Sequence, residues 1–421
     1  MRGAAAALAL AAFVAACDTG RDEGPVMLRL WALGREGEDV RQLIPEFERR
    51  NPGIRVRVQQ MPWTAAHEKL LTAHVGESTP DVSQLGNTWV PEFAALGALE
   101  PLEPWVARSA ATQVADFFPG IWATNIVDDT LFGVPWYVDT RVLFYRRDIL
   151  ARAGHRSPPK TWDEWVTAME RVKALGGQDR YPILLPIEEW AQPVIFGLQN
   201  GAPILRDGGR YGAFSEPRFR EAFDFYISLF RRGLAPTVAS QQVANVFQEF
   251  ATGGIAMWIT GPWNIGELRK RLPPELQDDW ATTPLPGPRP PGPGVSNAGG
   301  SSLVIFRGSR HKAEAWKLIE FLTATEQQRR FFHINGDLPA RESAWRDTAL
   351  TGDPHARAFL EQLRRAQPMP KVPEWEQIAT RVAQAAEQVA RGRRSTDEAL
   401  AALDRDVNAM LEKRRWMLAR R

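Results

Sequence analysis

The sequence is poor in the residues and motifs that most catalytic and metal sites require. A single Cys in 421 residues rules out a disulfide framework and a cysteine-rich metal site. The six His show no zinc-helix spacing, and there is neither a phosphate-binding loop nor a dinucleotide-binding glycine fingerprint. The segment Gly299 to Leu303 lacks the closing Gly of a serine nucleophile elbow. These absences leave a glycosidase open, but they favour binding over catalysis and predict no cofactor and no metal site.

The chain has no excess charge of either sign. Lys and Arg number 52 against 50 Asp and Glu, a formal net charge of +2. The basic runs 391–394 and 413–415 alternate with acids, which predicts solvated helix faces rather than a nucleic-acid surface. With 44% hydrophobic and 24% charged residues, the composition is that of a soluble globular protein. The length predicts two domains or three.

Tryptophan is the residue type in excess, with 16 Trp against 5 Tyr. An indole is a large apolar plate with one N–H donor, so it suits both core packing and flat ligand faces. The excess therefore indicates a large core, or a ligand surface built from rings.

The first residues have the pattern of an export signal. The small and apolar run 4–16 is shorter than the about 20 residues of a membrane span and fits a signal peptide. It ends in Val14-Ala15-Ala16-Cys17, which resembles the bacterial lipobox; the alternative is a free or buried Cys. In Gram-negative lipoproteins an Asp after this Cys, here Asp18, is associated with inner-membrane retention. We expect residues 1–16 to be a signal peptide, residues 17–25 a lipidated tether, and the body periplasmic.

Strand and helix periodicities alternate in the first hundred residues. Val26 to Trp31 and Ile54 to Val58 alternate as strands, and a third strand opens at Pro80. Helices are predicted between them at 40–47, where Pro45 is expected to kink the pattern, and at 65–75. This β-α-β-α-β order implies a parallel sheet with right-handed crossovers.

The rest of the chain alternates in the same way. Thr161 and Glu164 predict a capping box before a helix at 162–175. The Pro- and Gly-rich segment 284–294 predicts a surface loop. Further strands and helices are predicted at 131–146, 218–230, 301–306, 312–322, 378–389 and 395–411. The predicted fold class is α/β.

Several segments resemble, in order, the landmarks of one family. The chain resembles the extracellular solute-binding proteins of the sugar-binding class that feed ABC transporters, the maltose- and trehalose-binding proteins among them. The resemblance covers nearly the whole mature chain. It rests on Phe132 to Thr140 with Phe144 to Leu150, Pro158 to Trp165, Gly254 to Asn264, Gly299-Gly300, Lys312 to Leu322, and Leu338 to Arg341.

The resemblance implies a two-lobe periplasmic-binding-protein fold of type II. Each lobe would be a mixed sheet flanked by helices, with the ligand in a cleft that closes by hinge bending. The N-terminal lobe is expected at 26–138 plus 305–341, and the C-terminal lobe at 139–304 plus 342–421. The implied partners are a sugar and the permease subunits of a transporter, and the implied state is a monomer anchored to the membrane.

Candidate ligand-binding residues on the hinge strand and in the N-terminal lobe come from the resemblance and from strand ends. Asp139 lies where the family places a carboxylate on the hinge strand; the alternative is an ion pair with Arg141 or Arg146. Tyr137 is two residues earlier and points to the same side. Open α/β sheets bind ligands at the carboxyl ends of parallel strands. This rule adds the loops after the first and third strands, with Arg35, Glu36, Asn87, Thr88 and Trp89.

The C-terminal lobe supplies the remaining candidates. In the family, the Trp after the Gly-Pro turn, here Trp263, faces the ligand. Gln367 precedes Pro368 where many relatives carry Arg, so the resemblance does not carry over that cationic contact. Further candidates are Asn264, Glu189, Trp190, the late aromatic Trp375, and Gly299 and Gly300, which would permit close backbone approach.

The predicted function is capture of a di- or oligosaccharide, such as the α-glucosides trehalose or maltose, for delivery to a permease. A sugar has apolar C–H faces that pack on rings, and hydroxyls that bind carboxylates and amides. Two alternatives stay open. One is a binding protein for another solute such as glycerol-3-phosphate, which would use more cationic contacts. The other is a secreted carbohydrate-active enzyme with two cleft carboxylates.

Overall fold

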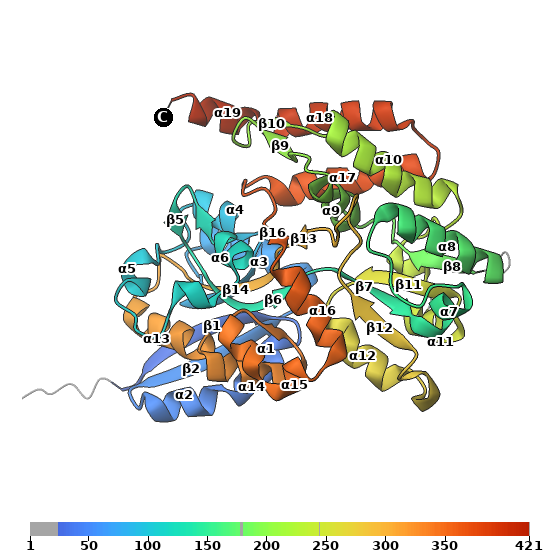
Figure 1. The fold of residues 1–421 in the computed structure, drawn as a ribbon. Coiled ribbons are helices and arrows are strands. Elements are labelled where there is room, and N and C mark those ends of the chain that lie inside the picture. Colours follow the sequence, from blue (N-terminus) through green and yellow to red (C-terminus); the bar gives the residue numbers. More distant parts are fainter. Residues whose placement is uncertain (1–23, 177–179, 244, 421) are drawn as a thin grey trace, which may run out of the picture.

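The computed structural model describes residues 24–176, 180–243 and 245–420, and within these ranges two larger sheets lie among helices (Figure 1). The first sheet has the strand order β15-β6-β14-β3-β1-β2. Its strands are β1 (Val26–Leu33), β2 (Ile54–Met61), β3 (Val82–Gly86), β6 (Val134–Asp139), β14 (Gly299–Ile305) and β15 (Leu338–Pro339). The signal-peptide and lipidation predictions, including Cys17, lie outside the described residues.

The parallel start predicted from the sequence is confirmed. β1 pairs in parallel with β2 from Val26↔Ile54 to Leu33↔Met61, and with β3 at Leu30↔Val82. β14 runs antiparallel between β3 and β6. The carboxyl ends of β1, β2 and β3 therefore meet at one edge of the sheet, and their amino ends meet at the opposite edge.

The single helix predicted over 40–47 is replaced by three short pieces that begin earlier, at Glu36. They are α1 (Glu36–Asp39), a 3₁₀ turn (Val40–Gln42) and α2 (Ile44–Arg50). Pro45 lies in the first turn of α2, where its missing N–H removes no helical hydrogen bond. The other helices around the first sheet are α3 (Trp63–Val75), α4 (Val90–Ala95), α5 (Glu103–Val106), α6 (Pro119–Ala123), α13 (Lys312–Leu322), α14 (Thr325–Asn335) and α15 (Thr348–Thr351). None of the described helices is long and apolar enough to cross a bilayer.

The second sheet has the order β12-β7-β11-β8, with one parallel pair, β11 and β8. Its strands are β7 (Val142–Arg146), β8 (Tyr181–Leu184), β11 (Ile255–Thr260) and β12 (Trp280–Thr283). Figure 1 shows α17 (Trp375–Ala390) and α18 (Thr396–Met410) at the top of the view, beside α10 (Pro217–Arg231). The other helices of this half are α7 (Arg147–Arg152), α8 (Trp162–Gly176), α9 (Ala191–Gln199), α11 (Val246–Thr252), α12 (Trp263–Arg271), α16 (Pro354–Leu363) and α19 (Glu412–Leu418).

The capping box predicted before α8 is only half formed. The Thr161 hydroxyl accepts from the Glu164 amide at 3.3 Å, as expected. The Glu164 carboxylate, however, accepts from the Lys160 amide at 2.8 Å, one residue before the predicted donor.

The two halves are joined where β6 leads into β7 and where the chain returns to β14. Asp139 pairs with Gly299 across these segments, and the Thr140 hydroxyl donates to the Asn297 carbonyl at 2.7 Å. The short strand β13 (Ser296–Asn297) also pairs with β16 (Ala366–Gln367). Residues 299–304 belong to β14 of the first sheet, although the expected boundary at 304 assigned them to the C-terminal lobe.

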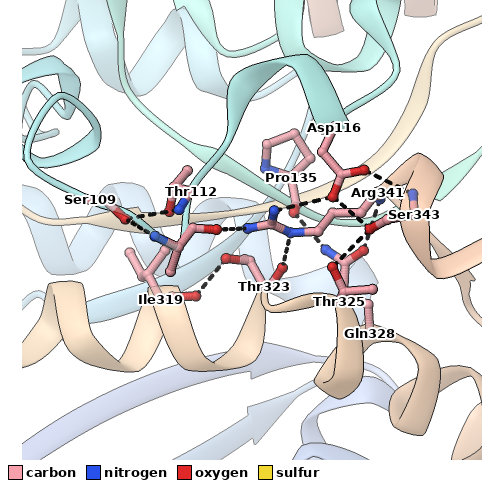
Figure 2. A network of polar contacts seen from close by, with 11 residues as sticks. Ser109, Thr112, Asp116, Pro135, Ile319, Thr323, Thr325, Gln328, Arg341 and Ser343 are labelled. Carbon is pink, nitrogen blue, oxygen red and sulfur yellow. Dashed lines mark hydrogen bonds and ion pairs between the residues drawn. The ribbon is translucent and has the colours of Figure 1, made fainter.

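The landmark ending in Arg341 serves as an internal clamp of the first half (Figure 2). The buried guanidinium of Arg341 donates to the Thr323 carbonyl at 2.6 Å, the Ala111 carbonyl at 2.9 Å and the Asp116 carboxylate at 3.3 Å. Asp116 also accepts from the amide and hydroxyl of Ser343. One side chain thus ties together the loop before α6, the end of α13 and the segment after β15.

Candidate functional site

A cleft of about 480 Å³ opens between the two halves, beside the crossing segments. This volume lies within the range of about 300–1,000 Å³ that is typical of small-molecule sites. The carboxyl ends of β1, β2 and β3 supply one wall, the end of β6 and the start of β14 the floor, and the loops before α9 and α12 the opposite wall. The lining residues are Glu36, Trp63, Gly86, Asn87, Thr88, Trp89, Tyr137, Val138, Asp139, Arg141, Trp190, Pro262, Trp263, Asn297, Ala298, Gly299, Gly300, Asp337 and Met369.

Tyr137 holds Glu36 in place on the floor of the cleft. Its hydroxyl donates to Glu36 Oε1 at 2.8 Å and accepts from Ser301 Oγ at 3.0 Å and Gln84 Nε2 at 3.2 Å. Gln84 Oε1 in turn accepts from the Leu33 amide at the end of β1. The network fixes the Glu36 carboxyl where β1 opens into α1.

Burial and mutual repulsion weaken the acidity of two cleft carboxyls. Desolvation raises the pKa of Glu36, although hydrogen bonds, among them those from Tyr137 and Trp63, oppose the shift. Desolvation, together with the nearby Glu36 charge, raises the pKa of Asp337 well above its usual range. The Asn335 side chain donates to Asp337 at 2.8 Å. These carboxyls can therefore hold protons that an exposed carboxyl would lose, so they can donate as well as accept hydrogen bonds.

Asp139 and Trp263 meet at Arg141, which comes from the crossing segment. The Arg141 guanidinium donates to Asp139 Oδ1 at 3.0 Å and lies over the Trp263 indole, 4.7 Å from the ring centroid. The ion pair named above as the alternative role of Asp139 therefore exists, within the cleft lining. Trp263 is 48% exposed, so part of its ring remains open to a ligand.

Two glycines make this geometry possible. Gly300 has φ of +116°, a conformation that L side chains rarely adopt, and an added Cβ would overlap the Tyr137 carbonyl. Gly261 lies under the Trp263 ring, and a Cβ there would overlap the indole. Both positions therefore favour glycine for a steric reason.

Indole rings from both halves face the cleft. On one side Trp63 and Trp89 lie 5.6 Å apart, edge to face. Trp89 is backed by His67 at 5.0 Å, which bonds Glu92 at 2.6 Å. On the other side, Trp190 rests edge-on against Trp375 at 5.4 Å.

The structure gathers most of the predicted residues in this one cleft and leaves four aside. Trp375 is fully buried behind Trp190, so it supports the lining without reaching it. Asn264 is 4% exposed, and its amide donates to Thr260 at 2.8 Å. Arg35 forms an exposed pair with Asp39, and Glu189 accepts from Gln192. The predicted residues that line the cleft are Glu36, Asn87, Thr88, Trp89, Tyr137, Asp139, Trp190, Trp263, Gly299 and Gly300.

Sequence reasoning missed several lining residues. Trp63 follows β2 at the same sheet edge, so the strand-end rule that selected Asn87 could have found it. The sequence marks Arg141 only as an ion-pair partner of Asp139. Asp337, Asn297 and Met369 arrive by long-range pairing and have no local signal. Among the described residues, no group of three or more His, Cys, Asp or Glu could hold a metal ion.

Comparisons with known proteins agree with this architecture. The family model for bacterial extracellular solute-binding proteins matches residues 31–329. The chain is 27% identical to a putative binding protein of Brucella abortus over 415 residues, 98% of each chain. It is 26% identical to the diacetylchitobiose binding protein of Streptomyces coelicolor, over 83% of this chain and 80% of that protein. The structure of the sugar-binding protein MalE from Xanthomonas citri matches with a TM-score of 0.91 and 49% identity, covering 94% and 100% of the two chains.

Proposed function

Because the chain belongs to the bacterial extracellular solute-binding proteins and is a sugar-binding component of an ABC transporter, not an enzyme, we propose that it captures a di- or oligosaccharide in the cleft between its lobes. The fold is the two-lobed type II periplasmic-binding fold, with a hinge between the lobes. An α-glucoside such as maltose or trehalose is the proposed ligand.

The observation that carries the proposal is the meeting of ring faces and carboxylates in one cleft. Trp263 offers a half-open indole face beside Asp139, and Trp63 and Trp89 face it from the other lobe. The apolar C–H face of a pyranose packs on such a ring, while its hydroxyls bridge the acidic groups. A cleft of about 480 Å³ is large enough for a small saccharide.

The charge of the cleft argues against a phosphorylated solute. Three carboxyls, those of Glu36, Asp139 and Asp337, line it against one guanidinium, that of Arg141, which Asp139 already engages. Among the described lining residues, a phosphate group would find three carboxyls and no free cation to pair with. The arrangement therefore favours a neutral sugar over glycerol-3-phosphate.

Membrane anchoring and hinge closure complete the proposal. The sequence Val14-Ala15-Ala16-Cys17 supports lipidation of Cys17, followed by a short tether that holds a monomeric body beside the inner membrane. The crossing at Asp139 and Gly299 supports closure of the lobes around the ligand before delivery to the permease. The lobes are divided at the boundaries given above, except that residues 299–304 belong to the first lobe.

Calorimetric titration with maltose, trehalose, maltotriose and glycerol-3-phosphate tests the ligand assignment. We expect a dissociation constant of about 1 μM or below for at least one α-glucoside, which corresponds to about 8 kcal/mol, and none for glycerol-3-phosphate. Asp139→Ala should weaken sugar binding at least about tenfold, since it removes a charged acceptor. Asp397→Ala, an exposed acid paired with Arg220, is the matched control. If none of the sugars in the panel binds, the sugar assignment is wrong.

Labelling with radioactive palmitate tests the anchor separately. Cys17→Ala should abolish the label and release the protein from membranes, while leaving sugar affinity unchanged. Label retained in the variant would show that Cys17 is not the lipidated residue.

A further inference from the structure

A second, larger hollow of about 800 Å³ lies on the N-terminal lobe at the sheet edge opposite the cleft. It is formed by the amino ends of β1 and β3, the end of α3, and the loops that follow α4 and β14. The cleft lies at the carboxyl ends of the same strands. The two openings are therefore separated by the length of β1, eight residues or about 26 Å.

The exposed charge of this hollow is mainly positive. Arg29, Arg307 and Arg310 line it and are exposed, and among the described residues the guanidinium groups of Arg307 and Arg310 have no hydrogen-bond or ion-pair partner. Of the two acids that line it, Asp81 is buried, accepts from the Arg29 amide and the Ser309 hydroxyl, and pairs with the Arg29 guanidinium at 3.8 Å. Glu77 is the remaining, exposed acid.

Apolar side chains gather at the rim of the same hollow. Val75 is 84% exposed and Met27 52% exposed, and both line it. Leu96, 48% exposed, directly precedes Gly97, which also lines it. Large apolar groups exposed beside unpaired cations are typical of surfaces that enter the headgroup region of a bilayer.

The path of the chain places this surface close to the membrane headgroups. Met27 lies at the start of β1, so the described chain enters the body beside the hollow. Between Cys17 and Val26 there are only residues 18–25, which reach at most about 30 Å when extended. A lipid on Cys17 would therefore keep the hollow within a tether length of the headgroups.

We propose that this hollow is a docking surface for the anionic headgroups of the membrane in which the protein is anchored. The proposal rests on the lipid anchor of the proposed function. Arg307 and Arg310 would bind headgroup phosphates, and Arg29, which is paired with Asp81, would add positive charge beside them. Met27, Val75 and Leu96 would enter the interface. Since the cleft lies at the opposite end of the same strands, a body seated in this way keeps its cleft turned away from the bilayer and open to passing solute.

Hydrogen exchange of the lipidated full chain tests the proposal on vesicles of phosphatidylcholine with and without phosphatidylglycerol. Phosphatidylglycerol should slow exchange about tenfold in residues 74–79 and 307–311. Salt at about 1 M, where the Debye length is about 3 Å, should remove this protection. Arg307→Glu with Arg310→Glu should abolish it, whereas Arg393→Glu with Arg394→Glu, the same charge change at exposed arginines of the C-terminal lobe, should leave it intact.

The outcomes separate docking from anchoring. Equal exchange on both vesicle types, with the protein still vesicle-bound, would overturn the docking surface. Protection that requires added permease instead of phosphatidylglycerol would also overturn it and would identify a protein-binding face. Protein that sediments with phosphatidylglycerol vesicles only would support the docking surface and refute the anchor. Sugar affinity should be the same in both double arginine variants as in the parent.

Discussion

The guanidinium of Arg141 lies over the indole of Trp263, 4.7 Å from the ring centroid, and joins the two sides of the cleft. Arg141 lies two residues after the end of β6 in the first sheet, whereas Trp263 begins α12 of the second half. The same guanidinium donates to Asp139 at 3.0 Å. A ligand that stacks on Trp263 must therefore share this ring with a cation, and it meets the Asp139 carboxylate at once.

Removal of the Trp263 ring should weaken sugar binding without unfolding the protein. Trp263→Ala loses one stacking face, and we expect affinity to fall at least tenfold, which is about 1.4 kcal/mol. Trp416→Ala is a close control, because Trp416 is also half exposed and also lies under an arginine, Arg420, at 3.7 Å. Calorimetry on both variants gives the comparison. Equal affinities would mean that the ligand does not use Trp263.

A methyl group at position 300 should disturb the crossing segments. Gly300→Ala adds both the strain of φ +116° and an overlap with the Tyr137 carbonyl, so the free energy of unfolding should fall by about 2 kcal/mol or more. Gly392→Ala isolates the first effect, since Gly392 has φ of +69° with open space around its Cβ position. Chemical denaturation should rank Gly300→Ala as the more damaging change. The reverse order would argue against the overlap.

Asp337 should make stability fall as the pH rises. Desolvation raises its pKa in the folded state, so the folded protein keeps a proton that the unfolded chain loses above about pH 4. Its stabilising contribution is complete below that pH and is lost as the pH rises through the folded-state pKa. The free energy of unfolding of Asp337→Asn, measured relative to that of the parent, should therefore increase as the pH rises, by at most about 1.4 kcal/mol per pH unit.

The control for this pH dependence is Asp397→Asn, an exposed acid whose stability difference from the parent should not grow over the same pH range. Urea denaturation at a series of pH values measures both differences. A flat difference for Asp337→Asn would contradict the raised pKa.

Loss of the Arg341 side chain should destabilise the N-terminal lobe. Arg341→Met leaves the Asp116 carboxylate without its cation and two backbone carbonyls without their donor, so we expect a loss of about 3 kcal/mol in the free energy of unfolding. Arg393→Met, at an exposed position, should be near neutral. Sugar affinity of the folded Arg341→Met protein should be unchanged, because the clamp lies outside the cleft lining.

Local sequence patterns are sufficient to predict the helices and strands, but they do not predict how deeply each side chain is buried. The α/β class is confirmed, and α13 begins and ends at the predicted residues, because its apolar stripe and length are local properties. The family resemblance places Trp375 at the ligand by its position in the order of landmarks. Its own helix predicts otherwise, since Trp375, Ile378, Val382 and Val389 form one buried stripe.

Residues that reach the cleft through strand pairing distant in the sequence could not be predicted from local patterns. Asp337 adjoins β15, a two-residue strand that pairs with β6 about 200 positions earlier in the chain, and Gln84 supports Tyr137 from the middle of a buried strand. Neither has a periodicity or motif of its own. Such residues can be placed in the cleft only when the strand order of the sheet is known, and local sequence patterns do not reveal that order.

The pairing of Asp139 with Gly299 at the crossing also bears on the order of events during capture. A point on the axis of a rotation hardly moves, whereas a point far from it sweeps a long arc. Asp139 lies near the pivot of the proposed closure, so its contact with a ligand is available before the lobes move. Trp63 and Trp190 line the cleft from opposite halves, so in the proposed closure their rings would approach a common ligand only as the angle narrows. On the proposed closure, residues at the pivot would select the solute, and the more distant rings would then retain it.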